Sequence, residues 1–109
     1  MAEIVIGVDG GTTAVKAVAF DLDGKIKALH HESVPVQYGQ NGEAEQNMDM
    51  IWEAVANCLH EVAAATRGDK IVGIGLTGQG DGAWLIDEEG EPVRPAANWL
   101  DGRAAKRVQ

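Results

Sequence analysis

Apolar residues occur in short runs separated by polar, glycine-rich segments, and their spacing predicts strands at the start of the chain. Alternating and β-branched apolar residues predict three strands, over about residues 3–8, 15–21 and 25–34. The connections between these strands are short, and Asp-Leu-Asp-Gly at residues 21–24 is typical of a tight turn. We therefore expect an antiparallel meander, followed by a polar loop over residues 35–46.

One amphipathic helix is predicted over about residues 48–66. Asn47 or Asp49 can cap its first turn, and Gly68 is placed to end it. Its apolar face is made of Met48, Ile51, Trp52, Val55, Leu59 and Val62. We expect this face, with Met48 and Trp52, to pack in the core.

A further apolar run over residues 71–76 predicts a buried strand. Because it follows a helical crossover, it should lie parallel to an earlier strand. A glycine-rich loop over 77–82 and a short strand over 83–86 are expected next. The order β-β-β-α-β indicates an α/β fold with a mixed sheet.

The last part of the chain is predicted to be a turn over residues 87–90, then an irregular segment containing two prolines, then a helix that begins near Gly102. No stop signal for this helix precedes Gln109. We therefore expect the chain to be a piece of a longer protein, with sheet edges and apolar surface that make it poorly stable alone.

The net charge limits the kinds of binding partner, and the cysteine content indicates the cellular compartment. The net charge of −8 argues against nucleic acid and against an anionic membrane surface. Cys58 is the single cysteine, so no intrachain disulfide forms, and a reducing cytoplasm is the expected compartment. Its place in the helical pattern predicts a small buried thiol rather than a nucleophile. No signal peptide and no apolar run of membrane-spanning length are found.

The first candidate site is the turn Asp-Gly-Gly-Thr-Thr at residues 9–13, between the first two strands. Its glycines allow an anion to approach the backbone, and successive N–H groups form an anion-binding concavity. Thr12 and Thr13 add hydroxyl donors, and Asp9 is placed to meet a phosphate-bound Mg²⁺ directly or through water. An ordinary hairpin turn is the alternative, since Asp-Gly is a strong turn signal.

Two further clusters carry groups that suit a hydroxylated ligand. In the loop after the fourth strand, Gln79 and Asp81 supply an amide and a carboxylate at the strand end where ligands gather. The alternative there is a flexible loop with solvated side chains. Near the end of the chain, Trp99 can form an apolar wall, with Asp101 or Arg103 binding hydroxyls. Alternatively, Asp101 and Arg103 pair with each other or cap a helix.

These clusters together resemble the FGGY family of carbohydrate kinases, within the superfamily of actin, heat-shock chaperones and sugar kinases. The matching segments are Gly7–Lys16, Glu45-Gln46, Gly73–Gly82 and Trp99–Arg103, which occur in the family's order and spacing across the chain. The first segment is shared with the wider superfamily. The Gly-Gln loop and the Trp-x-Asp-x-Arg cluster are specific to this family.

The resemblance implies a ribonuclease-H-like (actin-like ATPase) fold, with residues 1–109 forming the first part of an N-terminal kinase domain. In such kinases ATP and sugar meet in a cleft between two domains. The general base and the adenosine pocket are expected beyond residue 109, so we expect no catalytic residue in this chain and no activity from it alone. The cofactors implied are ATP and Mg²⁺, and a homodimer of the longer protein is compatible with the resemblance.

Carried over residue by residue, the resemblance assigns three roles to residues of the site: metal binding, phosphate binding and substrate binding. Asp9 helps hold the magnesium. The ATP phosphates are bound by Asp9, Gly11, Thr12, Thr13 and Lys16. The substrate pocket is formed by Gln79, Gly80, Asp81, Trp99, Asp101 and Arg103.

The pair Gly80-Asp81 departs from two branches of the family. Xylulose kinases usually carry Met-His there and glycerol kinases Arg-Glu, so the pair looks more like the branch that handles L-xylulose, erythritol or related polyols. The expected partner is a small ketopentose, such as xylulose or L-xylulose, or an erythritol-like polyol. The alternatives are a non-catalytic ATP-gated protein of the chaperone or filament kind and a sugar-binding regulator without transfer activity.

Overall fold

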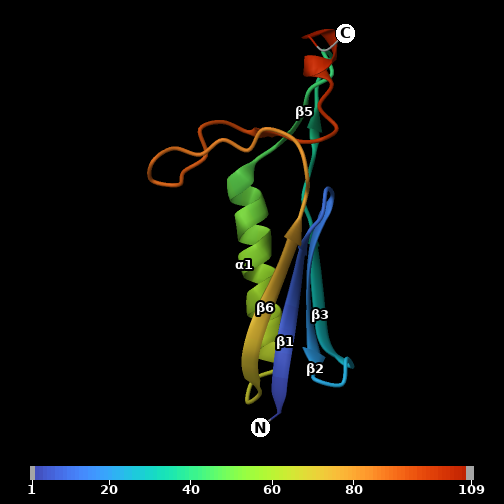
Figure 1. Ribbon diagram of the computed structural model, residues 1–109, viewed down its shortest axis with the longest axis vertical. Helices are drawn as coiled ribbons and strands as arrows, with labels where there is room; N and C mark the ends of the chain where they lie inside the picture. The colour runs from blue at the N-terminus through green and yellow to red at the C-terminus, as the bar shows by residue number, and fades with distance from the viewer. Residues whose placement is uncertain (1, 108–109) are drawn as a thin grey trace.

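The computed structural model describes residues 2–107, and its main body is a four-stranded sheet with one long helix against one face (Figure 1). The strands are β1 (Glu3–Gly10), β2 (Ala14–Asp21), β3 (Ile26–Ser33) and β6 (Lys70–Gly78), in the order β3-β2-β1-β6. Pairing is antiparallel between β1, β2 and β3, whereas β6 runs parallel to β1. The expected meander and the parallel crossover strand are therefore confirmed.

The core lies between this sheet and helix α1 (Met48–Ala65). Alternate residues of β1 and β2 face the helix: Ile4, Ile6, Val8, Val15, Ala17 and Ala19 are all buried. From the helix, Ala54, Cys58 and Val62 close the core. The expected buried thiol is confirmed, and burial raises the pKa of Cys58, with the nearby Glu32 carboxylate acting in the same direction.

The predicted apolar face of the helix is wrong at its N-terminal end. Trp52 is 67% exposed and Met48 is only partly buried. The helix instead contacts the sheet through Ala54, Cys58 and Val62. These side chains are small and four residues apart, so the helix can approach the sheet closely. The predicted ends are confirmed: the Asn47 side chain accepts from the Met50 N–H at 3.1 Å, and Thr66 is the C-cap, two residues before Gly68.

The prediction of a buried strand over residues 71–76 is wrong about burial. The strand exists as β6, but Leu76 is 76% exposed, and Ile71, Val72 and Ile74 are also exposed. The physical reason is that α1 packs on β2, β3 and β1, whereas β6 is the edge strand beyond it. Within residues 2–107 the side chains of β6 are therefore only partly covered.

A small second sheet replaces part of the predicted loop. It consists of β4 (Gln37–Tyr38), β5 (Ala44–Gln46) and β7 (Ala96–Ala97), in the order β4-β5-β7. The two-residue strand β4 and the three-residue strand β5 have too few side chains to show a period, so pattern alone predicts a loop over 35–46.

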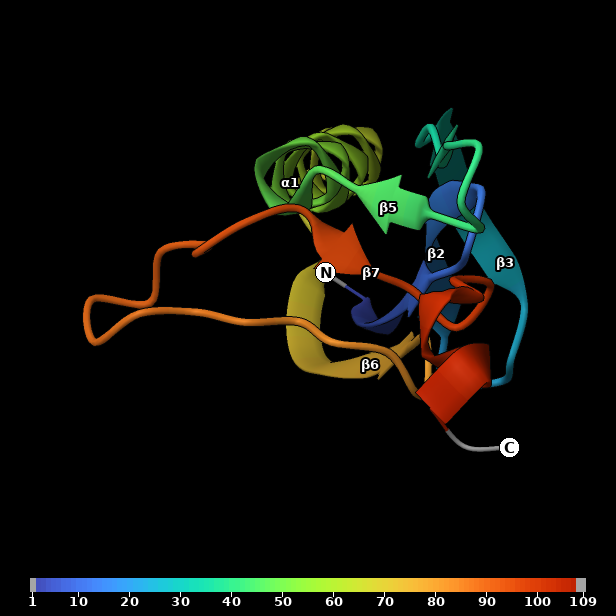
Figure 2. The same cartoon turned by 90° about the horizontal axis from the view of Figure 1, so that it is seen from above.

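The predicted short strand over residues 83–86 is also wrong. Ala83 and Ile86 make only isolated bridges, to Ala97 and Pro92. This part of the chain is an excursion between β6 and β7 that leaves the body of the molecule (Figure 2). It is followed by the predicted helix near Gly102, which is a short 3-10 helix, η1 (Arg103–Arg107). In the described part of the chain, no helix has the length and apolarity needed to cross a membrane.

Candidate functional site

The three predicted clusters approach one edge of the main sheet. Strands β1 and β6 are parallel neighbours, and their last residues, Gly10 and Gly78, are register partners. The β1–β2 turn and the loop after β6 therefore leave the sheet side by side. The carboxyl edge of an α/β sheet is the usual location of ligand sites.

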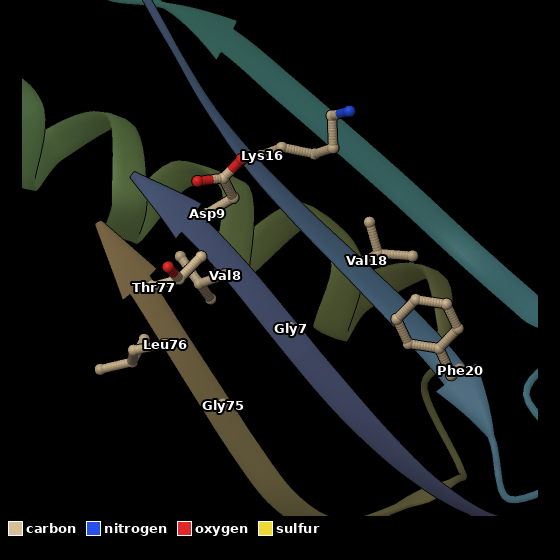
Figure 3. A pocket seen from close by; sticks show the side chains of 9 residues that line it. All are labelled: Gly7, Val8, Asp9, Lys16, Val18, Phe20, Gly75, Leu76 and Thr77. Carbon is tan, nitrogen blue, oxygen red and sulfur yellow. The ribbon is translucent and has the colours of Figure 1, made fainter. Parts of the chain in front are cut away.

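Asp9 and Lys16, two of the residues predicted to bind phosphate, lie on the sheet face opposite α1 (Figure 3). Asp9 is exposed, and its register partners are Lys16 on β2 and Thr77 on β6. These three residues line an open depression of about 380 Å³ whose remaining lining is largely apolar. The polar side chains that line the depression therefore all lie at its end next to the β1–β2 turn.

Glycine is required in the turn itself. A Cβ on Gly11 would come within 2.8 Å of the Ala14 carbonyl oxygen, a separation that real Cβ atoms do not show. The missing side chain keeps the turn narrow and leaves its backbone open to an approaching anion.

Gln46 joins all three clusters through its side-chain amide. The residue is fully buried, and its Nε2 donates to the Thr12 carbonyl oxygen at 2.8 Å. Its Oε1 accepts from Gln79 Nε2 at 2.9 Å and from Asn98 Nδ2 at 3.0 Å. One amide therefore holds the turn, the loop after β6 and the segment that begins at Asn98 in fixed relative positions.

Trp99 makes a second link to the turn. Its indole Nε1 donates to the Thr12 hydroxyl at 2.9 Å, while the residue remains 54% exposed. A hydroxyl that accepts one hydrogen bond keeps its own O–H for another acceptor. The Thr12 hydroxyl is thus oriented to donate, for example to a phosphate oxygen.

The side-chain oxygen of Gln79 is an unpartnered acceptor. Oε1 is buried and has no hydrogen-bond partner among residues 2–107. Gln79 also lines a cavity of about 220 Å³ with Gly10, Ile51, Gly78 and Trp84. Buried polar atoms are nearly always hydrogen-bonded in folded proteins, so this oxygen points to a donor supplied by a ligand or water.

Asp101 and Arg103 pair with each other, as the structural alternative predicted. Arg103 Nη2 donates to Asp101 Oδ2 at 2.7 Å and to Glu45 Oε2 at 2.8 Å. Asp101 Oδ2 also accepts from the Ala44 N–H at 2.9 Å. The Arg103 guanidinium holds the pKa of Asp101 well below its usual range, and the two carboxylates raise the pKa of Arg103. These contacts attach the Trp99 segment to β5.

The depressed pKa of Asp101 predicts a contribution to stability that depends on pH. A carboxylate whose pKa is lower in the folded state stabilises the protein above its unfolded pKa, about 4, and loses this effect as pH falls through the folded value. We expect the stability difference between the wild type and Asp101→Asn to be constant near pH 7 and to shrink below about pH 4. Urea unfolding at several pH values measures it, and a difference that does not change with pH would contradict it.

The loop after β6 is held against β7 by close backbone approach. Asp81 is exposed and has a φ of 58°, in the left-handed region, and its carbonyl oxygen accepts from Trp84 Nε1 at 3.2 Å. A Cβ on Gly82 would lie 2.5 Å from the Ala97 carbonyl oxygen. The Asp81 carboxylate is thereby presented from a constrained turn.

Gly82→Ala is expected to reduce the free energy of unfolding by about 1–3 kcal/mol, because its φ of +93° and the contact with β7 both oppose a side chain. Gly80→Ala is the matched control, since a Cβ there meets no atom within 4 Å. Chemical denaturation of both variants measures the difference. Equal stability of the two variants would contradict the prediction.

The site thus brings together some predicted residues and leaves others apart. Thr12, Gln79 and Trp99 belong to one hydrogen-bonded network. Asp101 and Arg103 are engaged with each other and with β5, and Asp81 lies outside the network. Gln46 was recognised only as part of the family resemblance, and Asn98 was not identified at all. A neutral amide carries no charge or spacing signal that distinguishes a buried linking residue from a surface one.

The fold belongs to the actin-like ATPase class, whose sugar kinases are its structural neighbours. Residues 4–109 match the N-terminal domain of the FGGY family of carbohydrate kinases, and the chain belongs to this family. The class expected from the turn, the loop and the Trp-x-Asp-x-Arg cluster is therefore confirmed.

The names of relatives in this family refer to several small polyols and sugars. The chain is 38% identical to an erythritol kinase of Brucella abortus, over 97% of this chain and 21% of that protein. It is 41% identical to a glycerol kinase of Aquifex aeolicus, over 92% of this chain and 20% of that protein. A ligand-bound xylulose kinase from Lactobacillus acidophilus has a TM-score of 0.90 at 29% identity, with 98% of this chain and 22% of that chain covered. The chain thus spans about a fifth of the length of the curated relatives it matches.

Proposed function

We propose that residues 1–109 form part of the N-terminal domain of an ATP-dependent kinase for a small sugar or polyol. The observation that carries the proposal is the side-chain amide of Gln46. It hydrogen-bonds both to Thr12, in the turn that we propose binds phosphate, and to Gln79, whose own Oε1 is an unpartnered acceptor. A phosphoryl-transfer enzyme works mainly by positioning donor and acceptor. A rigid link between an anion-binding turn and a hydroxyl-binding amide serves that purpose.

The phosphate half consists of Asp9, Gly11, Thr12, Thr13 and Lys16. The exposed carboxylate of Asp9 suits Mg²⁺, which prefers oxygen ligands and keeps several waters. When bound, the metal would neutralise charge on the phosphate oxygens. The backbone at Gly11 and the hydroxyls of Thr12 and Thr13 would hold the terminal phosphate, with Lys16 adding positive charge from β2.

The acceptor half consists of Gln79, Gly80, Asp81 and the exposed indole of Trp99. Gln79 Oε1 would accept a hydrogen bond from a substrate hydroxyl, and the Asp81 carboxylate would accept one or two more. Asp101 and Arg103 would border this pocket chiefly by holding Trp99 in place. An acceptor with adjacent hydroxyls fits these groups, and Gly80-Asp81 favours an L-xylulose or erythritol-like substrate over D-xylulose or glycerol.

The remaining parts of the enzyme are proposed to come from outside these residues. The general base and the adenosine pocket would be supplied by later segments, so the catalytic aspartate is not among residues 1–109. The acidic surface and the single buried thiol fit a cytoplasmic protein that binds neither nucleic acid nor membranes.

The test is ADP release by the longer protein with Mg-ATP, measured against erythritol, L-xylulose, D-xylulose, glycerol and five-carbon polyols. We expect turnover with one class of acceptor and none without an acceptor. ATP binding with no acceptor-stimulated turnover would contradict a kinase and favour a regulatory or chaperone-like protein.

Asp81→Asn is expected to raise KM for the acceptor more than it lowers kcat, because the carboxylate is proposed to bind hydroxyls rather than to accept the transferred proton. Asparagine tolerates the left-handed backbone at this position, so the loop should keep its shape. Initial rates at varied acceptor concentration separate the two constants. A large fall in kcat with unchanged KM would show that Asp81 acts in the chemical step instead.

A further inference from the structure

A cluster of three metal-binding side-chain types lies between β3 and α1, on the opposite side of the sheet from Asp9 and Lys16. His30 and Glu32 are register partners of Ala17 and Val15, both buried against α1, so they face the helix. Cys58 lies opposite them on α1 and is fully buried. One ligand atom from each residue falls within 4.8 Å of the other two, and His30 Nε2 lies 3.1 Å from Glu32 Oε2.

We propose that His30 Nε2, a Glu32 carboxylate oxygen and Cys58 Sγ bind a divalent zinc-like cation that joins β3 to α1. Imidazole nitrogen, carboxylate oxygen and thiolate sulfur are the ligands that Zn²⁺ takes in proteins. With metal–ligand bonds of about 2.0–2.3 Å, tetrahedral coordination separates ligand atoms by roughly 3.3–3.8 Å. The three ligand atoms all lie within 4.8 Å of one another, with His30 and Glu32 at 3.1 Å, so changes in side-chain torsion angles would bring them to this spacing.

The charge balance of the proposed site favours a buried cation. As the S–Zn bond forms, the Cys58 thiol releases its proton to solvent, while the imidazole of His30 contributes a nitrogen lone pair and the carboxylate of Glu32 an oxygen. A divalent ion with one thiolate and one carboxylate has no net charge, which limits the cost of placing it beside the core.

The surroundings of the cluster provide an entry path. The side chains of His30 and Glu32 are 35% and 33% exposed, so a cation can approach from solvent and keep water as a fourth ligand. Cys58 Sγ donates a long hydrogen bond, 3.6 Å, to the Val15 carbonyl oxygen. None of the three residues belongs to the proposed phosphate or acceptor sites, so this inference does not depend on the kinase activity.

Cobalt titration of the protein tests the site directly, because a cobalt–thiolate bond gives a charge-transfer absorption that a carboxylate or imidazole alone does not. We expect one Co²⁺ per chain with this absorption, and its loss on addition of Zn²⁺. Cys58→Ser should abolish the absorption, and His30→Gln should weaken binding roughly a hundredfold or more. His31→Gln is the matched control, since His31 is the next residue on β3 and is exposed.

Two further measurements keep the test decisive if Cys58→Ser does not fold. Zn²⁺ should raise the Tm of the wild type but not of Glu32→Gln or His30→Gln, and it should protect Cys58 from alkylation in the folded protein. No thiolate absorption, an equal affinity in His30→Gln, or an equal loss in His31→Gln would each overturn the proposal.

Discussion

Replacing Asp9 with asparagine is expected to lower kcat of the proposed kinase by on the order of a hundredfold or more, with a small effect on stability. Asp9 is exposed at the end of β1 and faces away from the core, so the isosteric amide should leave the fold intact. The loss of charge removes the proposed oxygen ligand for phosphate-bound Mg²⁺. Steady-state ADP release by the longer protein, at saturating acceptor, measures the effect.

The control for this experiment is Asp23→Asn. Asp23 is an exposed carboxylate in the turn between β2 and β3, at the opposite end of the sheet from the candidate site. We expect its kcat to equal that of the wild type. Increasing Mg²⁺ should partly restore Asp9→Asn if the carboxylate acts through the metal. Wild-type kcat in Asp9→Asn at limiting Mg²⁺ would contradict the assigned role.

Replacing Gln46 with leucine is expected to reduce the free energy of unfolding by about 2–4 kcal/mol. Leucine has a similar volume but leaves the Thr12 carbonyl oxygen, Gln79 Nε2 and Asn98 Nδ2 without their common partner. Each buried polar group left unsatisfied costs about 1–3 kcal/mol, and water entering the site would recover part of this. Urea denaturation monitored by circular dichroism measures the change.

Gln40→Leu is the matched control, because Gln40 is exposed in the turn between β4 and β5. We expect its stability to stay within about 0.5 kcal/mol of the wild type. In the longer protein, Gln46→Leu should also raise the acceptor KM, since Gln79 would lose its fixed orientation. Wild-type stability and KM in Gln46→Leu would show that the amide network does not organise the site.

The strand and helix predictions differ in accuracy for a physical reason. Alternation over eight residues of β1 and of β2 is a strong signal, and both strands lie where it predicts. The helix was also predicted, but the periodicity did not distinguish Trp52 from the smaller Ala54 and Cys58 as the residues nearest the sheet. That choice depends on how closely the helix can approach β2 and β3, which is a property of the packed pair.

The individual residues of the candidate site could be predicted from the sequence, but the contacts between them could not. Asp9, Thr12, Gln79 and Trp99 stand out in the sequence because they lie in or near glycine-containing segments and carry a carboxylate, a hydroxyl, an amide and an aromatic ring. The pairing of Asp101 with Arg103 was open from local spacing, since two residues apart on a loop permits contact but does not require it. Glu45 completes that ion pair from a distant strand, and a sequence pattern carries no information on such a contact.

The sequence by itself determined the class of this protein: the pattern of elements gave the α/β order, and the motifs at residues 7–16, 45–46, 73–82 and 99–103 carried the resemblance to the carbohydrate kinase family. These are local features, set by backbone preferences and by the period of apolar residues over a few positions. Only the tertiary structure decided that Gln46 links the three clusters, that β6 is an exposed edge, and that His30, Glu32 and Cys58 converge. Each of these depends on side chains distant in sequence that meet only when the helix docks on the sheet, and local patterning does not specify that geometry.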